Sequence, residues 1–138
     1  MAKLFRKGQS IKVLIDDAVF SIVPLTLAQK HEITKKLDGA QKGGIEAVGP
    51  MLEATKFAIK YSIKGLEGVT DGADEPYALE FGSDGFLTDD CVEDLSNFEA
   101  SDKLTQVLMG MLAKFGSQPE GLEGVTVNYV EKQSKTKK

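Results

Sequence analysis

The sequence predicts an α+β fold: a mainly helical single domain with an N-terminal β-hairpin and one or two further short strands. Two observations predict it. β-branched residues alternate along the first 25 residues around Asp16-Asp17, and apolar residues recur at helical spacing over much of the remaining chain. With 138 residues, of which 41% are hydrophobic and 28% charged, the chain is long enough to bury a core. The domain is expected to span residues 1–130, followed by a disordered basic tail at residues 131–138.

The hairpin is predicted within residues 10–25. The return strand ends before Pro24, because proline has no N–H to donate to a strand ladder. Successive side chains of a strand point to opposite faces, so alternate residues are expected on the buried face. These residues are Ile11, Val13, Ile15, Phe20 and Ile22.

Two helices are predicted next. Thr26 and Gln29 match the capping-box pattern, which predicts a helix from Thr26 to about Leu37. Glycines and small residues predict a loop at 39–49. A second helix is predicted over 50–65, with proline in its first turn and apolar residues around most of its circumference. Such a helix lies at the centre of a core or at an interface.

The second half of the chain begins with an irregular segment that contains a short predicted strand at 77–81. Thr88 and Ser101 are the predicted N-caps of two further helices, and Gly116 is predicted to close the second of them. This last helix has the most regular amphipathic pattern in the sequence. A final strand is predicted within 121–130. The apolar stripe of the last helix consists of Leu104, Val107, Leu108, Met111, Leu112 and Phe115.

A hexapeptide, Gly-Leu-Glu-Gly-Val-Thr, occurs twice, at 65–70 and at 121–126. Each copy follows a predicted helix, but the flanking residues of the two copies do not match. The repeat is therefore interpreted as similar loop chemistry rather than as a duplication.

Charge is strongly segregated along the sequence. The segment 65–102 contains twelve acidic residues and no lysine or arginine, whereas the rest of the chain has 17 basic and nine acidic residues. Two interpretations remain open: a solvated acidic surface that aids solubility, or a surface that docks a basic partner or a second copy of the chain. An acidic block repels phosphates, so nucleic acid is not an expected partner.

Several function classes find no support in the sequence. Its apolar runs are far shorter than the roughly 20 residues that span a bilayer, so no membrane interaction is expected. The single cysteine, Cys91, fits a reducing cytoplasm. Cys91 and the single histidine, His31, cannot supply the ligands of a zinc site. The acids lack the spacing of a calcium loop. We therefore expect no catalytic residues, no metal, no cofactor and no enzymatic activity.

The order of short motifs resembles the tail assembly chaperones of long-tailed bacteriophages over residues 10–127. Each motif is short, and their order and spacing carry the resemblance. The chain departs from the family pattern at 116–121, where a longer proline-rich segment is expected. The motifs are Phe20-Ser-Ile-Val-Pro-Leu-Thr26, Tyr61-Ser-Ile-Lys-Gly65, Glu75-Pro-Tyr-Ala-Leu-Glu-Phe81, Leu87-Thr-Asp-Asp-Cys-Val-Glu-Asp-Leu95, Asp102-Lys-Leu104 and Leu122-Glu-Gly-Val125.

The resemblance implies a function in virion morphogenesis. Such chaperones bind the long, helical tape measure protein, keep it soluble and help to recruit tail tube subunits around it. They self-associate, act in the host cell cytoplasm and are absent from the mature virion. The chain would correspond to the short, non-frameshifted form. The alternative is a structural protein of the virion, either a minor tail protein or a head-completion protein.

A chaperone for a helical client needs exposed apolar side chains at helical spacing. Methionine suits this role, because its flexible side chain adapts to varied surfaces. Met111 lies on the apolar stripe of the last helix and is more simply explained as a core residue, whereas Met109 lies off that stripe. The residues predicted to contact a partner are Met51, Phe57, Tyr61, Met109 and Phe115.

Overall fold

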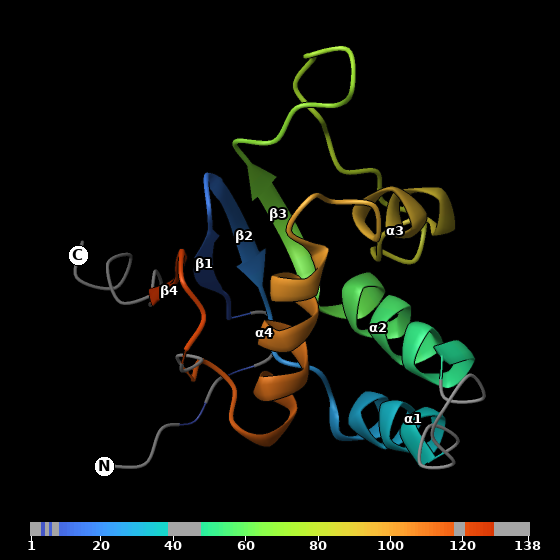
Figure 1. The fold of residues 1–138 in the computed structure, drawn as a ribbon. Helices are drawn as coiled ribbons and strands as arrows, with labels where there is room; N and C mark the ends of the chain where they lie inside the picture. Colours follow the sequence, from blue (N-terminus) through green and yellow to red (C-terminus); the bar gives the residue numbers. More distant parts are fainter. Residues whose placement is uncertain (1–3, 5, 7–8, 39–47, 118–120, 129–138) are drawn as a thin grey trace.

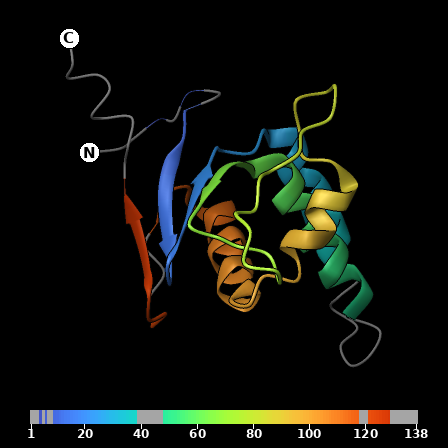
Figure 2. The same cartoon turned by 90° about the horizontal axis from the view of Figure 1, so that it is seen from above.

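The computed structural model describes the chain except for residues 1–3, 5, 7–8, 39–47, 118–120 and 129–138. The described part has an α+β fold with four helices and one four-stranded antiparallel sheet. Helix makes up 43% and strand 20%, which confirms the predicted mainly helical fold. The helices lie together on one face of the sheet (Figures 1 and 2). The predicted tail at 131–138 lies outside the described residues.

The predicted N-terminal hairpin is confirmed and forms the middle of the sheet. β1 (Ile11–Ile15) pairs antiparallel with β2 (Ala18–Ile22), and Asp16 turns the chain with a φ of 54°. β2 ends before Pro24, as predicted. β4 (Val125–Asn128) pairs with β1 and confirms the strand predicted near the carboxyl end. The buried residues of the hairpin are Ile11, Val13, Ile15, Ala18, Phe20 and Ile22.

The other edge strand, β3 (Ile63–Glu67), was not predicted. It pairs with β2, so the strand order is β3-β2-β1-β4. The helix predicted up to Gly65 is therefore wrong at its carboxyl end, because α2 stops at Ser62. The chain leaves the helix at Ile63, whose side chain is completely buried and which pairs with Ile22 across the sheet. Pairing and burial of this β-branched residue stabilise a strand here.

The repeated hexapeptide flanks the hairpin turn on both sides. The copy at 65–70 ends β3, and the copy at 121–126 begins β4. The second glycine of each copy, Gly68 or Gly124, has a positive φ and lies against the Asp16–Asp17 turn. The two copies therefore bring both edge strands close to the same turn. A side chain in place of Gly68 or Gly124 would collide with Asp17 or Asp16.

The first two helices lie side by side (Figure 1). α1 (Leu27–Asp38) begins with the predicted capping box: Thr26 N–H donates to Gln29 Oε1 at 2.9 Å, and Gln29 N–H donates to Thr26 Oγ1 at 3.1 Å. The loop predicted at 39–49 falls largely outside the described residues, and α2 (Val48–Ser62) follows it. α2 contacts α1, α3, α4 and β3, so it is the central helix of the layer.

The last two helices differ in how they begin. Thr88 caps α3 (Asp89–Leu95), as predicted, because its hydroxyl accepts a backbone N–H of the first turn. The cap predicted at Ser101 is wrong, since α4 (Ser101–Ala113) already includes that residue. The preceding residue, Ala100, is buried, and its carbonyl accepts the N–H groups of the first turn. The predicted stripe of α4 is buried at Leu104, Val107, Leu108 and Met111.

The strand predicted at 77–81 is wrong. In the described segment 68–88, which follows β3, the strand-like pairing consists of two isolated β-bridges. The alternating apolar residues that suggested a strand belong to an extended loop, in which Tyr77 and Leu79 pack partly against the core. An extended loop on a core produces the same period of two as a strand. The bridges join Thr70 to Pro76 and Phe81 to Leu87.

Candidate functional site

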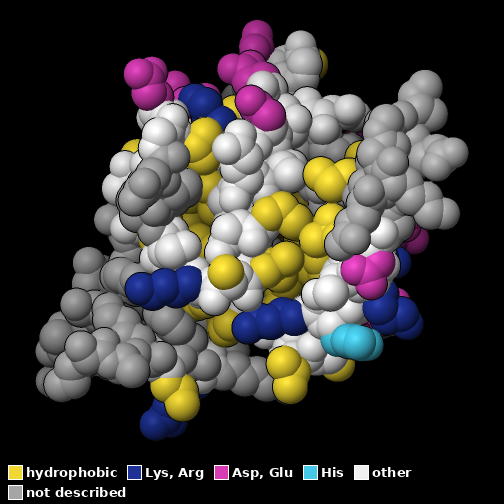
Figure 3. Space-filling view, turned by 60° about the horizontal axis from the view of Figure 1, so that its bottom comes forward, with side chains coloured by type: hydrophobic (Ala, Val, Ile, Leu, Met, Phe, Trp, Pro, Cys, Tyr) yellow, Lys and Arg dark blue, Asp and Glu magenta, His cyan; other side chains and the backbone are white. Residues whose placement is uncertain are grey.

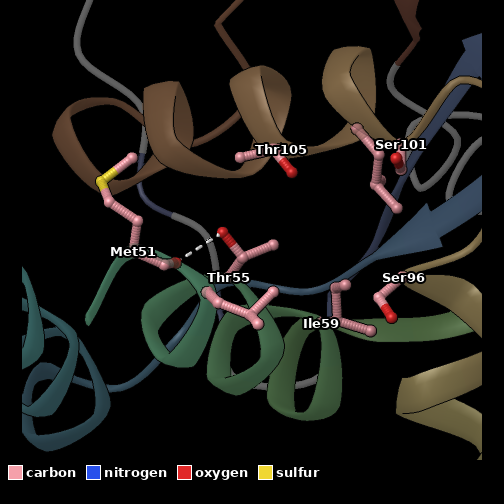
Figure 4. Close-up of a pocket in the computed structure, with 8 residues that line it drawn as sticks. Met51, Thr55, Ile59, Ser96, Ser101 and Thr105 are labelled. Atoms are coloured by element: carbon pink, nitrogen blue, oxygen red, sulfur yellow. Dashed lines mark hydrogen bonds between the residues drawn. The ribbon is translucent and has the colours of Figure 1, made fainter. Parts of the chain in front are cut away.

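A groove of about 450 Å³ lies between α2 and α4. Its floor is formed by Ile59 and Leu104, which are both buried. Hydroxyl groups of Thr55 and Thr105 lie on the two facing helices (Figure 4). The groove therefore combines an apolar floor with a rim of small polar side chains, as binding sites for largely apolar ligands do. The lining residues are Met51, Leu52, Thr55, Ile59, Ser96, Ser101, Leu104 and Thr105.

Two large apolar side chains at one end of the groove are exposed to solvent. Met51 is 44% exposed, and Leu52, its neighbour on the central helix, is 47% exposed. Apolar side chains also gather in the middle of the molecular face drawn in Figure 3, with charged side chains around them. Exposed apolar surface that continues into a groove marks an interaction site more often than scattered single residues do.

One end of the groove is lined by Ser96 and Ser101, and we call it the serine end. Ion pairs between α2 and α3 stabilise the structure at this end. Lys56 Nζ lies 2.8 Å from Glu93 Oε1, and this hydrogen bond raises the pKa of Lys56 above its ordinary value. Ser96 donates its hydroxyl to the Glu93 carbonyl at 2.7 Å. Lys60 forms a second pair with Asp89. These contacts hold α3 beside α2, and Ser96, the residue that follows α3, borders the groove.

Of the five residues predicted to contact a partner, Met51 lines the groove and the other four do not. Phe57 and Tyr61 lie on another face of α2, with ring centroids 4.6 Å apart. Tyr61 also packs on Phe86 at 4.6 Å. Both predicted residues are half-buried in this aromatic cluster, which joins α2 to the loop before α3.

The remaining two predicted residues belong to α4 and its carboxyl end. Met109 is half-buried and packs against the core. Phe115 is also half-buried and borders a small apolar recess together with Ile22 and Pro24. The positions of these four side chains do not test whether a partner contacts them, so the assignments stay predictions.

The prediction missed Leu52, Thr55 and the serines at the far end of the groove. A signal for the α2 wall exists in the sequence, because Leu52, Thr55 and Ile59 are separated by three and four residues and so share one helix face. What the pattern does not reveal is that α4 leaves this face partly uncovered. Helix spacing identifies a face, but the packing of the neighbouring helix decides whether it is filled.

Outside the groove, the side chains of Tyr77, Asp94 and Cys91 contact one another. Tyr77 donates its hydroxyl to Asp94 Oδ2 at 2.8 Å, and it lies 3.4 Å from the buried Cys91 Sγ. Burial, followed by these hydrogen bonds, raises the pKa of Tyr77 well above its ordinary value. His31 is exposed on α1. Among the residues that the structure describes, no three His, Cys, Asp or Glu side chains are placed to hold a metal ion.

Comparison of the chain with protein-family models, with curated proteins and with solved structures identified no match. Within the described ranges, no helix has the length and apolar character needed to cross a membrane. The described part of the chain has a four-stranded antiparallel sheet with a helical layer on one face. Within that layer, the groove between α2 and α4 has the apolar floor and polar rim of a binding site.

Proposed function

We propose that this protein is an assembly chaperone that holds an amphipathic helix of a client protein in the groove between α2 and α4. The observation that carries the proposal is the half-exposed pair Met51 and Leu52 beside an apolar groove floor. A helix presents apolar side chains three and four residues apart, and such a stripe fits a groove between two helices. Covering the stripe keeps an unassembled client soluble.

The resemblance to tail assembly chaperones supports a tape measure protein as the client. Long helical proteins of that kind expose apolar stripes until their partners cover them. In this proposal the chaperone acts in the host cell cytoplasm, helps to recruit tail tube protein, self-associates and is left out of the virion. Mass spectrometry of purified virions distinguishes it from the alternative, because a minor tail or head-completion protein remains in the particle.

Co-expression with the natural tape measure protein tests the client. We expect the wild-type chain to move most of the client from the insoluble to the soluble fraction. Leu52→Asp should abolish this gain, since it places a charge beside the apolar floor. Leu27→Asp is the matched control, because Leu27 is 83% exposed at the start of α1 and is not among the lining residues.

Two results would count against the proposal. If the wild-type chain leaves the solubility of its natural tape measure protein unchanged, the client is wrong. If Leu52→Asp and Leu27→Asp both support the client as well as the wild type does, the client binds elsewhere. Circular dichroism of both variants establishes that any loss reflects binding rather than unfolding.

A further inference from the structure

A second cavity, of about 780 Å³, lies beside the hairpin turn. Three segments that are distant in the sequence line it: the turn between β1 and β2, the loop that follows β3, and the connection from α3 to α4, which meet in the upper half of Figure 1. Apolar side chains form part of its lining, because Ile15 and Leu95 are buried there and Phe98 is half-buried. A cavity of this volume is large enough to bind several side chains of another molecule.

The charged groups of this cavity are all carboxylates, so we call it the acidic cavity. Six of its sixteen lining residues are acidic, and none is a lysine or an arginine. Lys103 neutralises Asp16 at 2.9 Å, but Asp17, Asp74 and Glu99 are exposed and form no ion pair with any described residue. The cavity therefore keeps an excess of negative charge, which a cationic ligand would offset. The six acids are Asp16, Asp17, Asp71, Asp74, Asp94 and Glu99.

The combination of apolar and acidic lining fits lysine side chains better than a metal ion. Among the residues that the structure describes, no three His, Cys, Asp or Glu side chains are placed to hold a metal ion. A lysine side chain has a four-carbon stem that packs on apolar surface and an ammonium group that reaches polar groups beyond it. In the acidic cavity the apolar lining would contact the stems, and the exposed carboxylates would contact the ammonium groups.

The chain itself contains a lysine-rich segment after β4. Residues 132–138 include four lysines and no acidic residue. β4 begins beside the acidic cavity and runs away from it, since Val125 pairs with the lining residue Ile15 and Asn128 pairs with Lys12. To enter the cavity of its own chain, the segment would have to turn back along the whole strand. The cavity of a second copy does not impose this reversal.

We propose that the acidic cavity of one copy binds the lysine-rich segment 132–138 of a second copy. The contact is head-to-tail, because the cavity and the segment are different parts of the chain, so a bound pair keeps one cavity and one segment for further copies. The inference rests on the proposed function, since it specifies the surface used in self-association. It involves none of the residues that line the groove between α2 and α4.

Two neutralised variants and their mixture test the contact. The lysine variant replaces the four lysines of segment 132–138 by glutamine. The cavity variant is Asp17→Asn, Asp74→Asn and Glu99→Gln, which leaves the acids that form hydrogen bonds in the fold unchanged. Sedimentation of the full-length chain at low salt should show self-association that is about tenfold weaker in each variant, because each loses three or four exposed ion pairs.

Mixing the two variants gives the sharpest result. The lysine variant retains its acidic cavity and the cavity variant retains its lysines, so an equimolar mixture should regain association, but only as far as dimers. A mixture that stays as weakly associated as the separate variants would overturn the inference. Circular dichroism of both variants establishes that any loss of association does not reflect unfolding.

A matched control separates the position of the acids from the net charge. Glu80, Asp90 and Asp102 are exposed, form no ion pair with any described residue and do not line the acidic cavity. Neutralising these three changes the net charge as much as the cavity variant does, yet self-association should stay at the wild-type level. Equal weakening by both sets would show that only net charge matters. Wild-type association should also weaken at about 0.5 M salt, where the screening length is about 4 Å.

Carbodiimide coupling shows whether the contact joins two copies. This reagent links a lysine amine to a carboxylate where the two groups already touch. In an equal mixture of unlabelled and ¹⁵N-labelled protein, crosslinks from segment 132–138 to the acidic cavity should include peptide pairs of mixed label. Crosslinks with unmixed label alone would place the segment in the cavity of its own chain and contradict the inference.

The sedimentation results also distinguish the inference from the proposed function. If the wild-type chain stays monomeric at all concentrations, the self-association in the proposed function and the inference both fail. If the wild type self-associates and the lysine and cavity variants do so equally well, only the inference fails. Binding of a client helix in the groove between α2 and α4 is tested separately and does not depend on either result.

Discussion

Gly68→Ala is predicted to destabilise the protein strongly, because it affects the contact between the β3 edge and the hairpin turn. Gly68 has a φ of +80°, and a Cβ there would lie 2.5 Å from the backbone oxygen of Asp17. Gly124, the equivalent residue of the second hexapeptide, has a φ of +78°, and its Cβ would lie 2.5 Å from Asp16 Oδ1. Only the first of these collisions involves a backbone atom.

The size of the effect follows from two contributions. A left-handed backbone costs alanine about 1–2 kcal/mol relative to glycine. Gly85→Ala isolates this cost, since Gly85 has a φ of +85° and no atom within 4 Å of the built Cβ. At Gly68 the carbonyl of Asp17 must also move, and overpacking of this kind costs about 1–3 kcal/mol more. Gly68→Ala should therefore cost about 2–5 kcal/mol, against about 1–2 kcal/mol for the control.

Urea unfolding followed by far-UV circular dichroism measures both free energies of unfolding. Gly124→Ala should fall between Gly68→Ala and Gly85→Ala. The Asp16 carboxylate can rotate away from the new methyl group, but this breaks its 2.9 Å contact with Lys103. Equal free energies for Gly68→Ala and Gly85→Ala, within about 0.5 kcal/mol, would refute the reasoning.

Three further predictions concern Tyr77, Lys64 and Cys91. Tyr77→Phe should lower the free energy of unfolding by about 1–3 kcal/mol, as for a hydrogen bond to a charged group such as Asp94. Because the pKa of Tyr77 is raised above its ordinary 10.0, its contribution to stability should be lost as pH rises above 10, and urea titrations of the variant should lack this alkaline loss. Burial lowers the pKa of Lys64 below its ordinary 10.5, so the unfolded chain binds more protons just below that pH. Stability there should rise with pH, and Lys64→Met should remove the rise. Cys91, only 1% exposed, should react with a thiol reagent at the rate of unfolding, and immediate labelling of the folded protein would contradict the structure.

The features predicted correctly are those that local sequence determines. The capping box of Thr26 and Gln29, the N-cap at Thr88 and the stripe of α4 each depend on residues within a few positions of one another. The hairpin is also local, because its strands are joined by a tight turn at Asp16. Helix and strand periodicities are sufficient at such places.

The errors occur where distant contacts decide the structure. Ile63 continues the apolar pattern of α2, yet pairing with Ile22 makes it the first residue of β3. Two residues further along that strand, Gly65 packs so closely on Ser21 that a Cβ would lie 2.8 Å from Ser21 Oγ. The groove is a similar case, because the exposure of Leu52 depends on where α4 packs. Tertiary contacts of this kind outweigh local propensity.

Methyl NMR of the methionines tests the central claim, that α2 and α4 form the client-binding groove. The chain has four methionines, and the spectrum is assigned by single Met→Leu substitutions. Met51 lines the groove, whereas Met109 and Met111 pack in or against the core and are not among its lining residues. Adding client helix should shift the Met51 methyl signal strongly and leave Met109 and Met111 nearly unchanged. An unchanged Met51 signal alongside a shifted Met109 would show that the client binds a different face of the protein.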